Sequence, residues 1–251
     1  MKLKNELWIL LILPIVYILI YNSKLDFIAP YLEEDSFIES IGALAFFIAS
    51  VLFLFMFFTR KEGYQFKFFG KSTNRNIYFL LLGILFFLAF GEEISWGQRI
   101  FGWSTPESFG DINAQKETNI HNLWVFQGYK KDGTPKSFIE NMLNFNRLFN
   151  IFWFLFCFVI PVLSLVSNKF KKFIQQIGIP QVPLWIGAFF MFNYIVFFIG
   201  VNINDIQDPE TGLNYTNGFD ETKETIYAIG FALLSIYYFR NLPIKKANGA
   251  N

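Results

Sequence analysis

Six apolar segments, each close to the length of a membrane-crossing helix, alternate with polar segments along the chain. They cover approximately residues 7–22, 37–59, 77–97, 148–167, 183–201 and 221–239. A bilayer core about 30 Å thick needs roughly 20 apolar residues in a helix, and a helix satisfies its own backbone hydrogen bonds in lipid. The pattern therefore predicts an all-α fold, a polytopic membrane helical bundle of about six transmembrane helices. It forms a single transmembrane domain over residues 1–251.

A long polar connection, residues 98–147, separates the third and fourth apolar segments. Loops this long are usually functional or disordered, and this one is too aromatic for disorder. Thr105-Pro106 and Thr134-Pro135 each offer a threonine cap followed by proline at the first helical position. Apolar residues then recur at helical spacing, at Phe138, Met142, Phe145 and Phe149. We expect an interfacial helix here that leads into the fourth apolar segment.

Basic residues indicate how the chain is oriented. If the N-terminus is cytoplasmic, the inside segments carry 13 of the 21 Lys and Arg residues. The positive-inside rule then places both termini in the cytoplasm and the 98–147 loop outside. The richness in Phe, Ile, Asn and Lys is typical of an AT-rich bacterial genome. We therefore expect a multi-pass protein of a bacterial inner (plasma) membrane.

Composition narrows the possible partners and cofactors. Hydrophobic residues make up 53% and charged residues 16%, against about 25% charged in soluble domains. This excludes a disordered chain, and the formal charge of +1 argues against a nucleic-acid partner. Membrane lipids are the expected partners, and a protein partner or a homo-oligomer remains open. A single cysteine, Cys157, excludes an internal disulfide, and a single histidine, His121, excludes metal motifs that need two.

Two adjacent glutamates, Glu92 and Glu93, are the strongest candidates for chemistry. They follow a long apolar run, and ionisable residues at membrane depth are costly and usually functional. If the helix continues through Arg99, then Glu92, Ser95 and Arg99 share one face. Repulsion between the two carboxylates would raise one pKa and leave one acid and one base. The alternative is that the pair only marks the end of a helix at the water interface.

His121 is the second candidate. Glu117 lies four residues before it, so a helix would present both on one face. Such a pair can bind a metal or hold an imidazole tautomer, and His121 can act as a general base. The alternative is a hydrogen-bonded structural histidine. We take Glu92, Glu93, His121 and Arg99 as candidate catalytic residues. Candidate substrate-binding residues are Trp96, Gln98, Trp103 and Asn122, and one divalent metal on Glu93, Glu117 and His121 is the candidate cofactor.

Three further polar features, a residue pair, a single residue and a loop, have structural explanations. Ser36 and Glu39 have the spacing of a capping box, although Glu39 is also a possible third carboxylate of the outer site. Asn193 lies inside the fifth apolar segment and is expected to form an interhelical hydrogen bond. Residues 202–224 are expected to form a solvated acidic loop.

The motif GEEISWGQRIFGWSTPESF at 91–109, followed by NAQKETNIHN at 113–122, resembles a signature of bacterial multi-pass membrane proteins. That family has no known activity, so the resemblance implies a membrane location only. The glutamate-type intramembrane CAAX proteases are more distantly similar, through their first motif Glu-Glu-x-x-x-Arg. Here Gly97 stands at the arginine position, the arginine is Arg99, and no second histidine is present for the later motifs.

The sequence leaves three functional interpretations. The first is an enzyme, a hydrolase or group transferase, that acts on a lipid or lipid-linked substrate at the outer face through a Glu/Arg/His site. The second is a non-catalytic subunit or partner-binding module whose aromatic outer loop is the interface. The third is a small-solute transporter or channel.

Overall fold

The computed structural model describes residues 8–22, 37–60, 66–68, 71–203 and 215–242. The long helical spans are α1 (Trp8–Asn22), α3 (Phe37–Thr59), α4 (Ile77–Glu93), α7 (Phe145–Trp153) together with α8 (Ile160–Val166), α10 (Leu184–Ile203) and α11 (Tyr215–Asn241). A π-helical turn, Phe154–Val159, joins α7 to α8 into one span. The short elements are β1 (Phe66–Phe68), β2 (Lys71–Thr73), α5 (Gln98–Phe101), α6 (Glu107–Gly110), α9 (Asn168–Ile177) and three 3₁₀ turns, Ser95–Gly97, Trp124–Phe126 and Glu140–Leu143.

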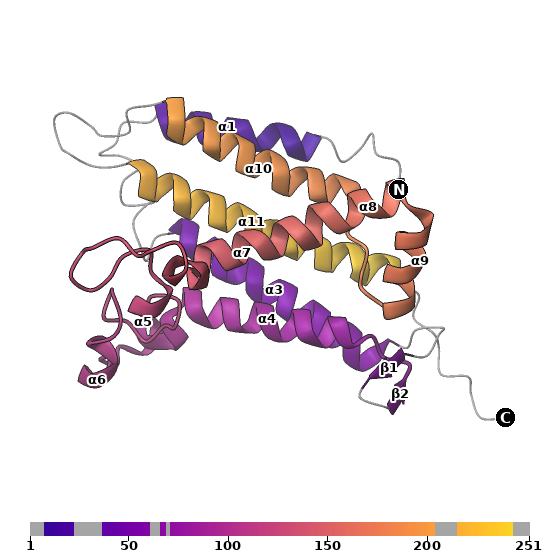
Figure 1. Cartoon of the computed structure of the whole chain (residues 1–251), viewed down its shortest axis with the longest axis horizontal. Helices are drawn as coiled ribbons and strands as arrows, with labels where there is room; N and C mark the ends of the chain where they lie inside the picture. Colours follow the sequence, from indigo (N-terminus) through magenta and orange to yellow (C-terminus); the bar gives the residue numbers. More distant parts are fainter. Residues whose placement is uncertain (1–7, 23–36, 61–65, 69–70, 204–214, 243–251) are drawn as a thin grey trace.

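The long helices lie side by side in a bundle, with the 98–147 loop gathered at one end and α9 at the other (Figure 1). Helix α4 packs on α3, α3 on α11, and α11 on α10, which also contacts α1 and the π-helical turn. Each predicted apolar segment is helical, which confirms the helical fold class. Two boundaries differ from the prediction: α4 ends at Glu93 rather than at 97, and α11 begins at Tyr215 rather than at 221.

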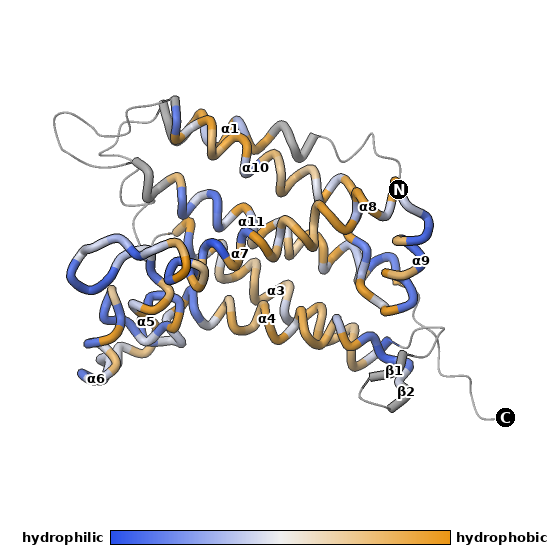
Figure 2. Tube along the Cα trace, in the orientation of Figure 1, coloured by the Kyte–Doolittle hydropathy of each residue, from blue (hydrophilic) through white to orange (hydrophobic). Residues whose placement is uncertain are grey.

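Within the described residues, three helical spans are long and apolar enough to cross a membrane: Phe37–Thr59, Phe145–Val166 and Leu184–Asn202. Apolar residues run along the middle of the bundle, and hydrophilic residues gather toward its ends (Figure 2). Large apolar side chains are exposed on the outer faces, including Leu44, Phe55, Leu85 and Phe198. Contiguous apolar exposure on this scale is unusual for a protein in water, and it is what a lipid-facing surface requires.

The structure confirms the interhelical hydrogen bond predicted for Asn193. The Tyr17 hydroxyl donates to Asn193 Oδ1 over 2.9 Å, and Asn193 Nδ2 donates to the Lys223 carbonyl over 3.0 Å. The asparagine is fully buried, so its amide would be costly without these partners. One side chain thus joins α1, α10 and α11.

A close backbone contact joins α10 to the π-helical turn. Pro161 has no N–H, so the carbonyl of Cys157, four residues earlier, loses its helical donor. Gly187 of α10 lies against this carbonyl: a Cβ added to Gly187 would lie 2.3 Å from Cys157 O. The glycine therefore allows an approach that no other residue permits.

Gly187→Ala is expected to destabilise the bundle by about 1–3 kcal/mol, because the added methyl group must separate two backbones. The unfolding midpoint in detergent measures this. Gly200→Ala, in the same helix, is the control, since no described atom lies within 4 Å of a Cβ added there. Equal midpoints for the two variants would contradict the prediction.

The interfacial helix predicted for the outer loop is wrong. The Thr134 hydroxyl donates to Asp132 Oδ1 over 2.6 Å in a turn, so it does not cap a helix, and Pro135 pairs with Tyr129 instead. Between Thr134 and α7 the only helical element is the 3₁₀ turn Glu140–Leu143. The first turn of α7 is capped by Asn144, whose side chain accepts from the backbone N–H of Arg147. Likewise α6 is a single turn. Ser36, the predicted partner of Glu39 in a capping box, lies outside the described residues.

Candidate functional site

The end of α4 reverses the chain. Ser95, Trp96 and Gly97 have φ values of 46°, 54° and 89°, and left-handed backbone at two successive non-glycine residues is strained. The helix therefore does not continue through Arg99, and the expected shared face of Glu92, Ser95 and Arg99 is not formed. The side chain of Arg99 lies outside the described residues.

This reversal folds Trp96 back onto α4. Its Nε1 donates to Glu92 Oε1 over 2.7 Å, and its ring meets Phe87 edge-on at 6.3 Å. The ring lies directly over Gly91, where an added Cβ would come within 2.9 Å of it. The strained turn thus aims an indole donor at the Glu92 carboxylate.

Gly91→Ala is expected to displace the Trp96 ring, remove its hydrogen bond to Glu92 and destabilise the protein by about 1–3 kcal/mol. The unfolding midpoint and the tryptophan emission maximum measure the two effects. Gly110→Ala is the control, because a Cβ there meets only ordinary contacts at 3.9 Å. An unchanged midpoint in Gly91→Ala would contradict this packing.

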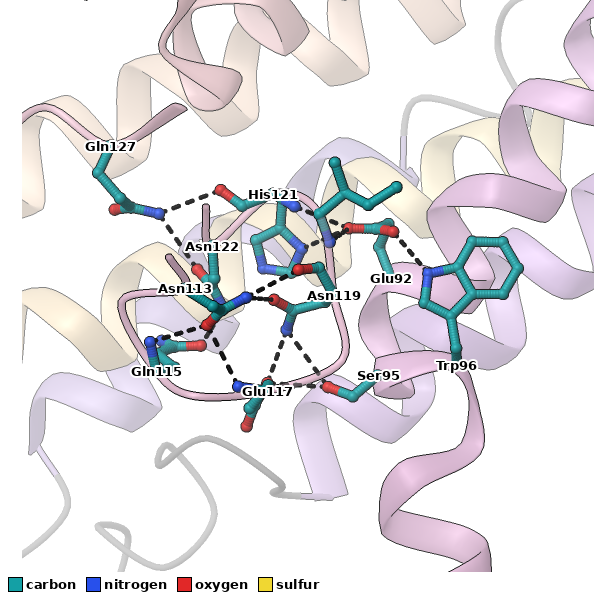
Figure 3. Close-up of polar contacts among 11 residues, drawn as sticks. Glu92, Ser95, Trp96, Asn113, Gln115, Glu117, Asn119, His121, Asn122 and Gln127 are labelled. Atoms are coloured by element: carbon teal, nitrogen blue, oxygen red, sulfur yellow. Dashed lines mark hydrogen bonds and ion pairs between the residues drawn. The ribbon is translucent and has the colours of Figure 1, made fainter. Parts of the chain in front are cut away.

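Buried amides hold the loop that carries His121. Asn113 Nδ2 donates to the Asn119 carbonyl over 2.8 Å, while Asn113 Oδ1 accepts from the backbone N–H groups of Gln115 and Glu117. Gln127 Nε2 donates to the carbonyl of His121 over 3.1 Å. Asn113 and Asn119 are almost fully buried. These contacts fix an irregular loop in one conformation beside the end of α4 (Figure 3).

Glu92 and His121 meet in this structure. Glu92 Oε2 accepts from the backbone N–H groups of Ile120 (2.6 Å) and His121 (2.8 Å), and it lies 3.2 Å from His121 Nδ1. The Glu92 side chain is 10% exposed. Burial opposes its ionisation, but the surrounding donors stabilise the anion. Figure 3 shows His121 and Trp96 on either side of the carboxylate.

The contact fixes the tautomer of His121. An ionised carboxylate only accepts hydrogen bonds, so the Nδ1 atom of a neutral ring carries the proton and Nε2 is left as the acceptor. The side chain is 32% exposed, and its ring lies 5.8 Å from Phe145 of α7. A carboxylate that orients an imidazole in this way is the arrangement of a general base and its positioning residue.

The predicted pairing of Glu117 with His121 on a helical face is wrong, because residues 115–122 are not helical. Glu117 Oε2 instead accepts from Ser95 Oγ (2.8 Å) and Asn119 Nδ2 (2.6 Å). Within the described residues, no group of three His, Cys, Asp or Glu side chains is placed to hold a metal. The predicted metal set of Glu93, Glu117 and His121 is therefore not assembled.

A cavity of about 500 Å³ lies beside the Glu92–His121 pair. Its polar end is formed by His121, Asn122 and neighbouring amides together with six glutamates, Glu39, Glu92, Glu93, Glu117, Glu221 and Glu224. Its other end is apolar and is formed mainly by Phe46, Leu85, Leu88, Leu148, Phe149 and Phe152. No described Lys or Arg lines it, although Lys223 Nζ lies 3.9 Å from Glu224 Oε1.

Three of the four predicted substrate-binding residues, Trp96, Gln98 and Trp103, do not line the cavity. Gln98 Oε1 accepts from the backbone N–H of Thr118 over 2.7 Å and so braces the loop. Trp103 is exposed and stacks on Phe101 at 5.4 Å. Neither residue lines the cavity, whereas Asn122 does. The reversal at 95–97 separates these side chains from the end of α4.

Glu221 and Glu224 are site residues that the sequence interpretation missed. The predicted acidic loop, 202–224, and the predicted apolar segment, 221–239, overlap at these residues, whereas α11 begins at Tyr215 and presents both to the cavity. Their spacing of three residues was the available indication, since it places both on one helical face. Residues 204–214 of the predicted loop lie outside the described residues.

The geometry thus brings together residues from four helices and one loop. No protein-family model, curated protein or solved structure matches this chain.

Proposed function

We propose that this protein is a membrane enzyme, a hydrolase or group transferase, that binds an amphiphilic lipid or lipid-linked substrate. The observation that carries the proposal is one cavity with an apolar half and a polar half, the polar half containing the oriented Glu92–His121 pair. An amphiphile has the matching division between chain and headgroup. Ligand cavities of several hundred Å³ with a few convergent polar groups are the usual form of such sites.

The proposed membrane placement follows from the distribution of charge. The bundle crosses a bacterial inner membrane six times, with both termini cytoplasmic and the cavity at the outer face. Every described acidic residue lies on the outer loop, on the last turn of α4, or near the starts of α3 and α11. The basic residues 169–172 lie on α9, at the other end of the bundle, as the positive-inside rule requires.

The substrate would enter sideways from the lipid. Leu85 and Leu88 of α4 and Leu148 of α7 line the cavity and are also exposed on the surface of the bundle. An acyl or prenyl chain would lie between α4 and α7 on a floor formed by Phe46 of α3. The headgroup would then reach the polar end without leaving the membrane interface.

His121 would accept a proton from water or from a substrate hydroxyl as that oxygen attacks the substrate. Glu92 would orient the ring and stabilise the imidazolium that forms. Glu93 lines the same cavity and is the candidate acid for the leaving group. The lining carries carboxyl groups and no described Lys or Arg, which favours a substrate headgroup that is uncharged or cationic.

The proposal is tested by blocking the cavity. We would purify the chain in mild detergent, extract the retained lipids and identify them by mass spectrometry. Ala89 lines the apolar half, so Ala89→Trp should reduce the retained amphiphile at least tenfold. Leu81→Trp, on the same helix but exposed and away from the cavity, is the control.

Turnover is tested with total lipid extract of the host membrane in ¹⁸O-labelled water. A hydrolase transfers the label into a product, and a transferase yields an unlabelled one. If the wild type retains no amphiphile and converts no lipid, the enzyme proposal fails, and the non-catalytic interpretation takes its place.

A further inference from the structure

A second cavity, of about 470 Å³, lies at the opposite end of the bundle from the Glu92–His121 pair. Its walls come from α8, from α9, from residues 181–183 before α10, from the start of α10 and from the last turns of α11. It shares no lining residue with the first cavity. Nothing in the proposed acid–base chemistry uses it.

Two polar groups in this cavity have no hydrogen-bond partner among the described residues. They are the Ser164 hydroxyl and the Gln181 side-chain amide nitrogen, and both atoms are buried. Ser164 is 8% exposed, and both residues line the cavity. The Gln181 backbone is held in place, because the Tyr238 hydroxyl donates to its carbonyl over 2.6 Å. Buried donors normally have partners, so these two point to a ligand that accepts hydrogen bonds.

The charge around the cavity favours an anionic acceptor. Lys171 of α9 lines it, and Lys169 and Lys172 lie on the same helix. No described acidic residue lies on α8, α9, α10 or the last turns of α11. One ammonium and two neutral donors around a cavity match the oxygens of a phosphate group.

We propose that this cavity binds the phosphate group of an anionic phospholipid at the basic end of the bundle. Leu165 and Leu184 line the cavity and are exposed on the surface of the bundle. An acyl chain would lie against them while the phosphate meets Lys171, Ser164 and Gln181. A soluble phosphate ester offers the same phosphate but has no chain to cover this apolar rim, which is why the lipid is favoured.

Native mass spectrometry of the full chain, titrated with phosphatidylglycerol and with phosphatidylcholine of the same acyl chains, tests the proposal. We expect tighter binding of phosphatidylglycerol, and a weakening of roughly fivefold in Lys171→Ala. Lys172→Ala removes the same charge from the same helix but not from the cavity wall, so it should weaken binding less than twofold. Equal losses in the two variants would show diffuse surface attraction and overturn the proposal.

Ser164→Ala separates a ligand site from a structural role. Because the hydroxyl has no protein partner, its removal should not lower the unfolding midpoint without lipid, yet it should weaken phosphatidylglycerol binding severalfold. A lower midpoint without lipid, together with unchanged lipid binding, would overturn the proposal. Displacement of the lipid by millimolar glycerol 3-phosphate would reassign the cavity to a soluble phosphate ester and would also overturn it.

Discussion

Glu92→Gln is expected to lower the free energy of unfolding by about 3 kcal/mol. The Glu92 carboxylate accepts from the indole of Trp96 and from the backbone N–H groups of Ile120 and His121, and it contacts the His121 ring. A glutamine has one oxygen where the carboxylate has two, so its NH₂ group must face a donor. The reversed turn and the outer loop would then lose the side chain that joins them.

Glu93→Gln is the matched control, since it makes the same change one residue later. Glu93 is half-buried at the cavity wall rather than enclosed by the loop. We expect its unfolding midpoint in detergent to stay within a few degrees of the wild type. Equal destabilisation by both variants would mean that the network around Glu92 is not what holds the loop.

His121→Gly is expected to reduce turnover of the identified lipid by about 10²–10⁴-fold, the usual contribution of a general base. The side chain is 32% exposed, and the backbone N–H groups of Ile120 and His121 that bind Glu92 remain in the variant. The effect on stability should therefore be much smaller than that of Glu92→Gln. Initial rates of ¹⁸O incorporation measure the loss.

Added imidazole distinguishes a base from a structural histidine. In His121→Gly it should restore part of the turnover, because the imidazole can enter the space left beside Glu92. Val125→Ala, in the same loop but exposed and away from the cavity, should retain wild-type rates. Unchanged turnover in His121→Gly would remove His121 from the mechanism and leave the cavity as a binding site only.

Local patterns were sufficient for the helices and for individual polar residues. The run from Phe37 to Thr59 ends where hydropathy predicts, because a helix in lipid is specified by its own length and composition. Asn193 was identified as an interhelical contact because an amide inside an apolar helix needs a partner. Glu92 and His121 were likewise candidates from the sequence, since ionisable groups beside apolar runs are costly.

The sequence predictions were wrong where a polar side chain has a hydrogen-bond partner other than the expected one. Thr134 looked like a helix cap, but Asp132 takes its hydroxyl in a turn. Residues 95–99 looked like a continued helix, but the contact between Trp96 and Glu92 accompanies a left-handed reversal. Such choices depend on partners that a local window does not contain.

The sequence by itself therefore determined the helical segments and the residue types able to do chemistry. Only the tertiary structure decided that Glu92 contacts His121, which lies 29 positions along the chain, and that Glu39 and Glu224 reach the same cavity. The physical reason is that helix formation follows from nearest neighbours and burial in lipid. A cavity depends instead on how helices distant in sequence pack, and on which buried amides hold the loop beside them.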